Sequence, residues 1–215
     1  MTEKLLEITD LKKHFPIKRG FFSKASVKVY AVDGISLSVK QGHTLGIVGE
    51  SGCGKTTAGK TVLKLIEPTG GEIRYKGENI TAYTRREMKK FRRQMQIIFQ
   101  DPFSSLNPRH TIATIIAAPF EIHGLADDTA MEDLIAELLK KVGLPPESMR
   151  RYPHEFSGGQ RQRAGIARAI ALHPEIIIAD EPVSALDVSI QAQILNLMKD
   201  CKMNSVWHIS LSLMI

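Results

Sequence analysis

"GESGCGKTT", residues 49–57, is the stretch that decides the fold, because it fits the pattern G-x-x-x-x-G-K-[ST] of a phosphate-binding loop. Residues 44–49 before it predict a strand, and residues 55–66 predict a helix that ends before Pro68. The pattern requires this context of strand, loop and helix. Glycines let successive backbone N–H groups face phosphate oxygens, and the helix N-terminus adds a favourable dipole. The stretch therefore predicts a site for nucleotide phosphates.

The side chains of this loop have separate expected roles. Lys55 is expected to reach the β- and γ-phosphates, and the Thr56 hydroxyl is expected to ligate Mg²⁺. A chance match in a chain of this size has a frequency of roughly one in a hundred. Cys53 is interpreted as a small loop residue rather than a redox group. The residues expected to bind nucleotide here are Gly49, Glu50, Ser51, Gly52, Cys53, Gly54, Lys55, Thr56 and Thr57.

A second motif, "EIIIADE", occupies residues 175–181. Its continuous apolar run predicts a strand of a parallel sheet that is covered on both faces. A buried strand that ends in acids can place Asp180 at Mg²⁺ and Glu181 beside an attacking water. Two acids alone are a weak signal, but downstream of a phosphate loop they predict nucleotide hydrolysis.

Composition sets the bounds of these interpretations. A chain of 215 residues, 43% apolar and 24% charged, predicts one main domain with a lobe inserted into it. The net charge of +6 suits an anionic ligand, nucleic acid or an anionic membrane without choosing among them. Two cysteines are too few for a disulfide framework or a zinc cluster, which favours a reducing compartment. With no signal peptide and no apolar run of about 20 residues, any membrane role is expected to be peripheral.

The first half of the chain reads as β structure followed by a basic helix. Residues 27–48 predict short strands with turns at Asp33-Gly34 and Gln41-Gly42, and residues 70–80 predict a further β stretch. Residues 85–96 are basic and predict a helix with an apolar seam. That seam is Met88, Phe91 and Met95. We interpret the cations on the other faces as a solvated surface rather than a nucleic-acid site.

The second half is predicted to be mainly helical. "QIIFQ", residues 96–100, predicts a buried strand, and helices are expected from there to about Leu172. One helix is expected to begin with a capping box, Thr129 with Glu132, and to stop at Gly143. Its predicted apolar face is Leu134, Ile135, Leu138, Leu139 and Val142.

"FSGGQRQR", residues 156–163, is the most specific element, and through it the chain resembles the ATP-binding subunits of ABC transporters. It matches the signature sequence of that family, with Phe156 where leucine is common, and the resemblance extends from Leu5 to Asp200. Ser157 and two glycines at a helix start form another anion-binding N-terminus. In the family this surface meets the γ-phosphate held by a partner subunit, which implies a dimer. The residues implied are Ser157, Gly158, Gly159 and Gln160.

The same resemblance implies roles for other positions. Gln100 matches the Q-loop glutamine, which contacts Mg²⁺ or water, serves catalysis beside Glu181 and links the site to the membrane subunits. Residues 184–187, "SALD", match the D-loop at the dimer interface. Phe15 is the candidate for stacking on adenine, with Tyr30 as the alternative.

The fold implied is α/β, a P-loop NTPase of ABC type. Residues 1–100 are expected to form the nucleotide-binding core with an N-terminal antiparallel β subdomain, residues 101–160 an inserted helical subdomain, and residues 161–200 the return to a mainly parallel core. Residues 201–215 are expected to be aberrant, with the C-terminal part of the domain missing.

The function implied is ATP hydrolysis, with ATP and Mg²⁺ bound, coupled to import of oligopeptides, dipeptides or nickel. The implied partners are a second ATPase subunit, integral membrane permease subunits and indirectly an extracytoplasmic solute-binding protein, with no nucleic acid. The implied location is peripheral, on the cytoplasmic face of the plasma membrane. Two alternatives stay open: a nucleotide-binding remnant without turnover, and a soluble ABC ATPase outside transport.

The tail, "CKMNSVWHISLSLMI" at residues 201–215, departs from the family pattern of a strand that ends in a switch histidine. His208 comes several residues too early for that role. If one base was lost after the Asp200 codon, regrouping the codons can restore "LQNEFGVAYLFISHD", which contains a helix end, an apolar strand and a histidine. We therefore expect an out-of-frame peptide and poor hydrolysis, and the bases after that codon test this expectation.

Overall fold

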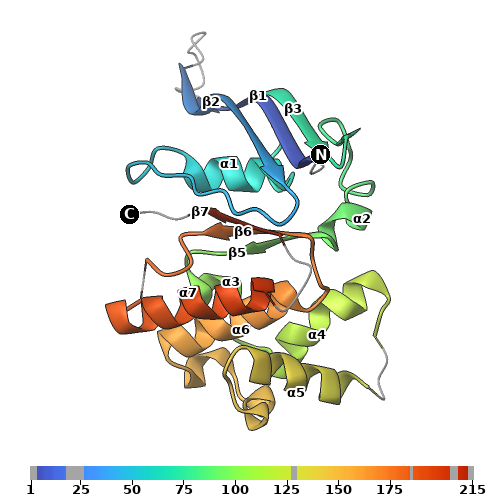
Figure 1. The fold of residues 1–215 in the computed structure, drawn as a ribbon, viewed down its shortest axis with the longest axis vertical. Helices are drawn as coiled ribbons and strands as arrows, with labels where there is room; N and C mark the ends of the chain where they lie inside the picture. Colours follow the sequence, from blue (N-terminus) through green and yellow to red (C-terminus); the bar gives the residue numbers. More distant parts are fainter. Residues whose placement is uncertain (1–3, 18–26, 127–129, 185, 204–207, 213–215) are drawn as a thin grey trace.

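The computed structural model describes residues 4–17, 27–126, 130–184, 186–203 and 208–212. Three layers are visible in Figure 1: an antiparallel sheet at one end, a parallel sheet in the middle, and helices at the other end. Helix α1 (Lys55–Val62) lies between the two sheets and contacts both. In the described part of the chain, every helix is too short or too polar to cross a bilayer.

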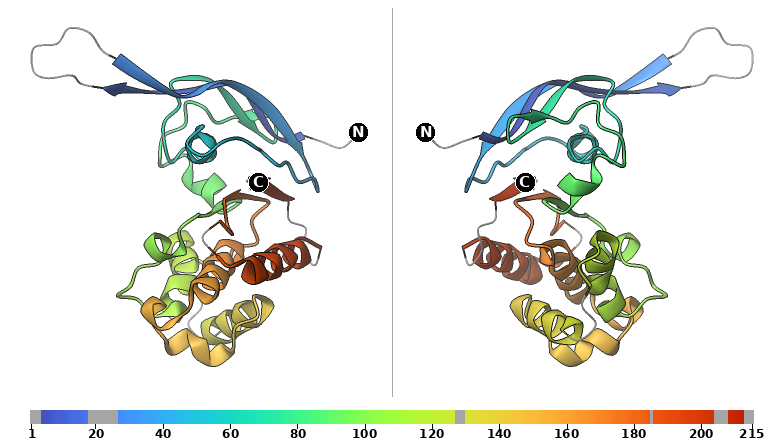
Figure 2. Two further views of the ribbon diagram at one scale, coloured as in Figure 1. Left: turned by 90° about the vertical axis from the view of Figure 1, so that its left-hand side faces the viewer. Right: turned by 90° about the vertical axis from the view of Figure 1, so that its right-hand side faces the viewer.

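The antiparallel sheet has the strand order β2-β1-β3-β4. Its strands are β1 (Lys4–Ile17), β2 (Val27–Lys40), β3 (Gly70–Tyr75) and β4 (Glu78–Asn79). The expectation of short strands around a turn at Asp33-Gly34 is wrong, because Gly34, at φ 81°, is absorbed as a bulge in the continuous strand β2. Figure 2 shows β1 and β2 running together as a ribbon that projects from the molecule.

The parallel sheet has the order β5-β6-β7, built from Met95–Ile98, Ile176–Asp180 and His208–Ser212. All five residues of β6 are buried, as predicted for a strand covered on both faces. Ile176 and Ile178 pack with the antiparallel sheet and α1, whereas Ile177 and Ala179 pack with the helical lobe. Because side chains alternate along a strand, β6 joins two hydrophobic cores and holds the layers together.

The segment that leads into the phosphate loop differs from the prediction. Residues 43–50 have no regular secondary structure, so the strand expected at 44–49 is wrong; no described strand supplies a ladder partner for it. Helix α1 also ends at Val62 rather than Ile66, because Lys64 adopts a left-handed conformation with φ 54°.

The helices follow the predicted order. They are α2 (Lys89–Arg92), α3 (Pro102–Ser105), α4 (Ile112–His123), α5 (Met131–Lys141), α6 (Gly158–Ile170) and α7 (Val188–Met203), with two 3₁₀ turns, η1 (Pro146–Arg150) and η2 (Pro153–Glu155). The helix expected over 85–96 is confined to four residues, because the chain becomes β5 at Met95. The predicted seam is nevertheless buried at all three of its positions.

The apolar face predicted for α5 is confirmed. Ile135, Leu138, Leu139 and Val142 are buried, Leu134 is partly buried, and Gly143 ends the helix with φ 70°. The capping residue expected at position 129 lies outside the described residues, and Ala130 holds the N-cap position.

The described part of the tail continues the fold. Helix α7 extends to Met203, and β7 pairs in parallel with β6. The reading frame after Asp200 is a property of the gene and stays a prediction.

Candidate nucleotide-binding site

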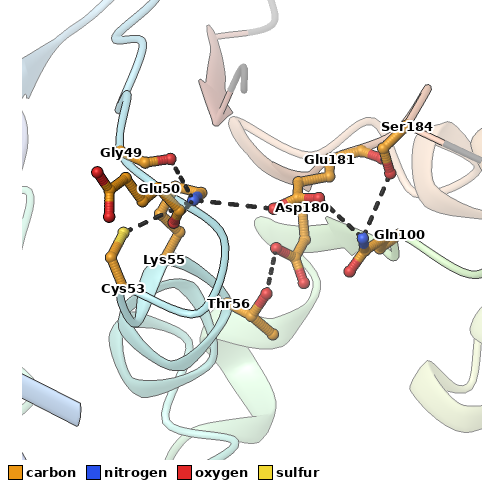
Figure 3. Close-up of polar contacts among 9 residues, drawn as sticks. All are labelled: Gly49, Glu50, Cys53, Lys55, Thr56, Gln100, Asp180, Glu181 and Ser184. Atoms are coloured by element: carbon orange, nitrogen blue, oxygen red, sulfur yellow. Dashed lines mark hydrogen bonds and ion pairs between the residues drawn. The ribbon is translucent and has the colours of Figure 1, made fainter. Parts of the chain in front are cut away.

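The phosphate loop closes around its own lysine. Lys55 begins α1, and its Nζ atom donates hydrogen bonds of 2.7 Å to the carbonyl oxygens of Gly49 and Glu50 (Figure 3). Its side chain is only 4% exposed. The Sγ atom of Cys53 lies 3.6 Å from the same ammonium group. The loop therefore already encloses a buried positive charge at a helix N-terminus, a combination suited to an anion.

Gly54 shows why this loop requires glycine. It is the N-cap of α1 with φ 98°, a conformation that side-chain-bearing residues rarely adopt. A Cβ atom at this position would lie 1.9 Å from the carbonyl oxygen of Ala31 on β2. The loop thus packs directly on the antiparallel sheet. The sequence carried no signal for Ala31, because this backbone contact joins segments that are adjacent only in the fold.

Thr56 and Asp180 meet at the carboxyl end of the parallel sheet. The Thr56 Oγ1 atom donates a 2.7 Å hydrogen bond to Asp180 Oδ1, and Asp180 is 5% exposed. Thr56 lies in the first turn of α1, and Asp180 is the last residue of β6. Hydroxyl and carboxylate oxygens are the donors that Mg²⁺ prefers, so this pair fits the expected magnesium site.

Glu181 lies next to this pair and contacts Gln100 (Figure 3). Gln100 Nε2 donates to Glu181 Oε2 at 2.8 Å and to Ser184 Oγ at 3.3 Å. Glu181 Oε1 lies 4.0 Å from Lys55 Nζ. The backbone of Glu181 has φ 46°, a strained conformation that costs roughly 1–3 kcal/mol and is found preferentially at functional sites. The expected catalytic pair is thus brought together.

The signature residues form a group of their own at the start of α6. Ser157 Oγ accepts from Gln160 N at 3.3 Å, while Gln160 Oε1 accepts from Ser157 N at 3.0 Å, which is a complete capping box. A Cβ atom on Gly159 would meet Ile190 of α7 at 2.7 Å, so this glycine allows close packing of α6 and α7. Among the described residues, no hydrogen bond joins this group to the phosphate loop.

The two candidates for adenine stacking lie on the projecting ribbon. Phe15 on β1 is 37% exposed, with Lys13 Nζ 4.9 Å from its ring centroid. Tyr30 on β2 is 61% exposed and meets the His14 ring edge-on at 4.4 Å. These contacts favour neither residue, so the choice stays a prediction.

The remaining residues considered in the sequence analysis lie outside the group of polar contacts that joins Lys55, Thr56, Gln100, Asp180 and Glu181. Ser51 and Gly52 lie in the exposed turn of the loop, and the Thr57 carbonyl accepts from Thr61 within α1. His208 opens β7 opposite Ile176, at the end of the sheet remote from Asp180.

The chain matches a known family and curated relatives. The family described as ABC transporter matches residues 32–184. The oligopeptide transport ATP-binding protein AppF of Bacillus subtilis is 56% identical over 92% of this chain and 60% of its own length. OppF of Lactococcus lactis is 50% identical over 91% of this chain and 61% of its own length. The glutathione import ATP-binding protein GsiA of Salmonella paratyphi A is 49% identical over 92% of this chain and 32% of its own length. The chain thus spans about three fifths of the length of its oligopeptide relatives.

Solved structures agree in fold. A dimeric post-hydrolysis state of the ATP-binding cassette MJ0796, bound to ADP and phosphate, superposes with a TM-score of 0.82 at 28% identity. That superposition covers 96% of this chain and 87% of the other.

Proposed function

This chain belongs to the ABC transporter family, and on that premise we propose that it binds and hydrolyses ATP to drive a peptide importer. One observation carries the proposal: five polar side chains from three separate segments converge at the carboxyl end of β6. They are Lys55, Thr56, Gln100, Asp180 and Glu181.

Lys55 and the loop backbone bind the phosphates of ATP. The Lys55 ammonium holds two neutral carbonyl oxygens, which are weaker acceptors than the charged oxygens of a phosphate. A nucleotide therefore replaces these carbonyls at a charge that is already desolvated. The N-terminus of α1 adds its dipole at the same point.

Thr56 and Asp180 would hold Mg²⁺, with the Gln100 carboxamide as a third oxygen donor. The first two already present their oxygens to each other at 2.7 Å. When bound, a magnesium ion would supply positive charge that offsets the charge of the nucleotide phosphates. The residues present fit this ion because all three donors are oxygen atoms.

Glu181 accepts the proton of the attacking water. Its carboxylate is fixed by Gln100 on one oxygen and lies near Lys55 on the other. A base held in one orientation saves the entropy of ordering it during the reaction.

We propose an assembly of two ATPase subunits, because the signature residues and the phosphate loop of one chain are separate. The group Ser157–Gln160 presents a helix N-terminus but has no hydrogen bond to the phosphate loop in the described chain, which suits a role on the nucleotide of a second ATPase subunit. That subunit is identical or similar to this one. Permease subunits at the cytoplasmic face of the plasma membrane, with an extracytoplasmic solute-binding protein beyond them, complete the transporter.

Peptides are the proposed cargo class. Relatives at 49–56% identity are named for oligopeptide transport and for glutathione import, and glutathione is itself a tripeptide. Dipeptides and nickel are narrower alternatives within this branch.

Nucleotide binding without turnover is a second candidate. One observation favours it: residues 43–50, which lead into the phosphate loop, pair with no described strand. A loop that lacks this support binds phosphate but holds it less firmly in the reactive geometry.

Phosphate release from Mg·ATP by the 215-residue chain tests the proposal, with Glu181→Gln as the matched variant. The variant keeps the size of the side chain and removes the base, so hydrolysis should fall by roughly 10²-fold while ATP affinity is retained. Equal turnover by parent and variant would exclude Glu181 as the base. ATP binding by a parent that does not hydrolyse would favour the second candidate.

A further inference from the structure

Helix α3 (Pro102–Ser105) begins two residues after Gln100, with Asp101 between them. Asp101 caps α3, accepting from the backbone N–H of Phe103 at 2.8 Å and of Ser104 at 3.3 Å. The Phe103 N–H lowers the pKa of the Asp101 carboxyl most, and the charge of Arg161 adds to this effect. A movement of α3 therefore reaches the backbone of Gln100 through the two peptide units on either side of Asp101.

Two arginines of α6 hold α3. They are seven residues apart, which is about two helical turns, so both lie on one side of the helix. The guanidinium carbon of Arg161 lies 4.1 Å from the Phe103 ring centroid, and its Nε donates to the Pro153 carbonyl oxygen at 2.8 Å. Arg168 Nη1 donates to the Ser105 carbonyl oxygen at 2.6 Å. The start and the end of α3 are thus both attached to α6.

The contact at Arg161 has a defined geometry. The bond to Pro153 uses the Nε–H, which fixes the plane of the guanidinium group, and the flat cation then lies against the face of an aromatic ring. Phe103 is 63% exposed, and among the described residues Arg161 is the cation that lies over its ring. A lysine cannot reproduce the arrangement, because it has neither the plane nor the Nε–H.

We propose that Arg161 is a positioning residue, which acts through Phe103 to hold Gln100 against Glu181. Arg161 lies four residues after Ser157, on the helix that begins with the signature group. A shift of α6 on contact with a nucleotide or a partner therefore moves α3 and changes the hydrogen bond between Gln100 and Glu181. The effect on catalysis rests on the proposed ATP hydrolysis. The contact by which Arg161 holds α3, called the mechanical link below, does not depend on that proposal.

Amide hydrogen exchange tests the mechanical link in the whole chain without nucleotide. In Arg161→Ala, exchange of peptides covering residues 100–106 should become on the order of fivefold faster. Arg163→Ala is the matched control, since Arg163 lies on the same helix but donates to the Val142 carbonyl oxygen and to Gln193. It should leave exchange at 100–106 at the parent level. Equal exchange at 100–106 in both variants and the parent would overturn the link.

Steady-state ATP hydrolysis tests the consequence. Arg161→Ala should lower kcat by about tenfold with KM for ATP within about twofold, because a misplaced Gln100 affects the reaction rather than binding. Phe103→Leu should give the same loss, and the double variant should be no slower than either single variant. Arg161→Lys should not restore kcat. Losses that multiply in the double variant, or a rise in KM alone, would contradict a path through Phe103.

The two arms separate failure of this inference from failure of the proposed function. A parent chain without ATP turnover would refute hydrolysis, and the exchange comparison would still decide whether Arg161 holds α3. If Arg161→Ala does not fold, Phe103→Leu carries the exchange test, because it removes the ring and leaves the bond to Pro153 in place.

Discussion

Lys55 provides a buried positive charge at the centre of the site. Its ammonium group is 4% exposed and interacts with two backbone carbonyls and a carboxylate oxygen 4.0 Å away. Lys55→Ala removes this desolvated charge, so we expect ATP affinity to fall by at least about tenfold, as measured by titration with a fluorescent nucleotide. Lys60→Ala, on the same helix, is the control and should bind ATP as the parent does. Unchanged affinity in Lys55→Ala would show that the loop is not the phosphate site.

Gly54 offers a second test at the scale of a residue, based on sterics rather than charge. A Cβ atom there would overlap the Ala31 carbonyl oxygen at 1.9 Å, whereas a Cβ on Gly52 would meet nothing within 4 Å. Both glycines have positive φ, so both alanine variants carry similar backbone strain. We expect Gly54→Ala to lower stability and ATP binding well beyond Gly52→Ala. Thermal unfolding and nucleotide titration measure the difference, and matching losses would argue against the close packing of loop and β2.

Helix α6 is the element that joins the signature group to the catalytic residues. Its N-cap is Ser157, which is exposed. The Ser157 hydroxyl oxygen accepts a hydrogen bond from the Gln160 N–H, and the Gln160 side-chain oxygen accepts one from the Ser157 N–H. Ser157→Ala leaves that N–H without its partner, so the free energy of unfolding should fall by about 1 kcal/mol, as measured by urea titration. Thr111→Ala removes the cap of α4 and should give a loss of the same size. A Ser157 variant as stable as the parent would mean that water replaces the cap at no cost.

Stability of the whole molecule should depend on pH through a histidine at the junction of α2 and α4. Burial, with the charges of Lys89 and Arg93, lowers the pKa of His123. The unfolded chain then binds a proton at higher pH than the folded chain, so stability is complete above about pH 6.5 and falls as the pH drops below it. His123→Gln should reduce the slope of unfolding free energy between about pH 7 and 5, and His173, whose pKa burial also lowers, accounts for part of what remains.

Arg93→Gln is the matched variant for this prediction. It keeps the histidine but removes one of the cations that oppose its protonation, so it should reduce the slope without abolishing it. The carboxyls of Glu78, Glu87 and Asp101 have lowered pKa values, and their contribution is lost only at more acidic pH. A slope between pH 7 and 5 that neither variant changes would exclude His123 as its source.

Much of the site was predictable because its chemistry is written in short, local motifs. The phosphate loop, the acids at the end of β6 and the helix start at Ser157 each depend on residues within about ten positions, and each is found where the motif predicts. The same holds for the buried strand β6 and the apolar face of α5, since their periodic patterns reflect which side faces a core.

Contacts between distant segments were decided only by the tertiary structure. The sequence by itself determined the phosphate loop, the two acids and the signature helix. It also predicted a strand at 44–49, because local propensity cannot tell whether a ladder partner is available. The bond of Thr56 to Asp180, the carbonyl of Ala31 under Gly54 and the hold of Arg161 on Phe103 join residues between 23 and 124 positions apart. Such contacts follow from how the layers pack around β6, which no local pattern encodes.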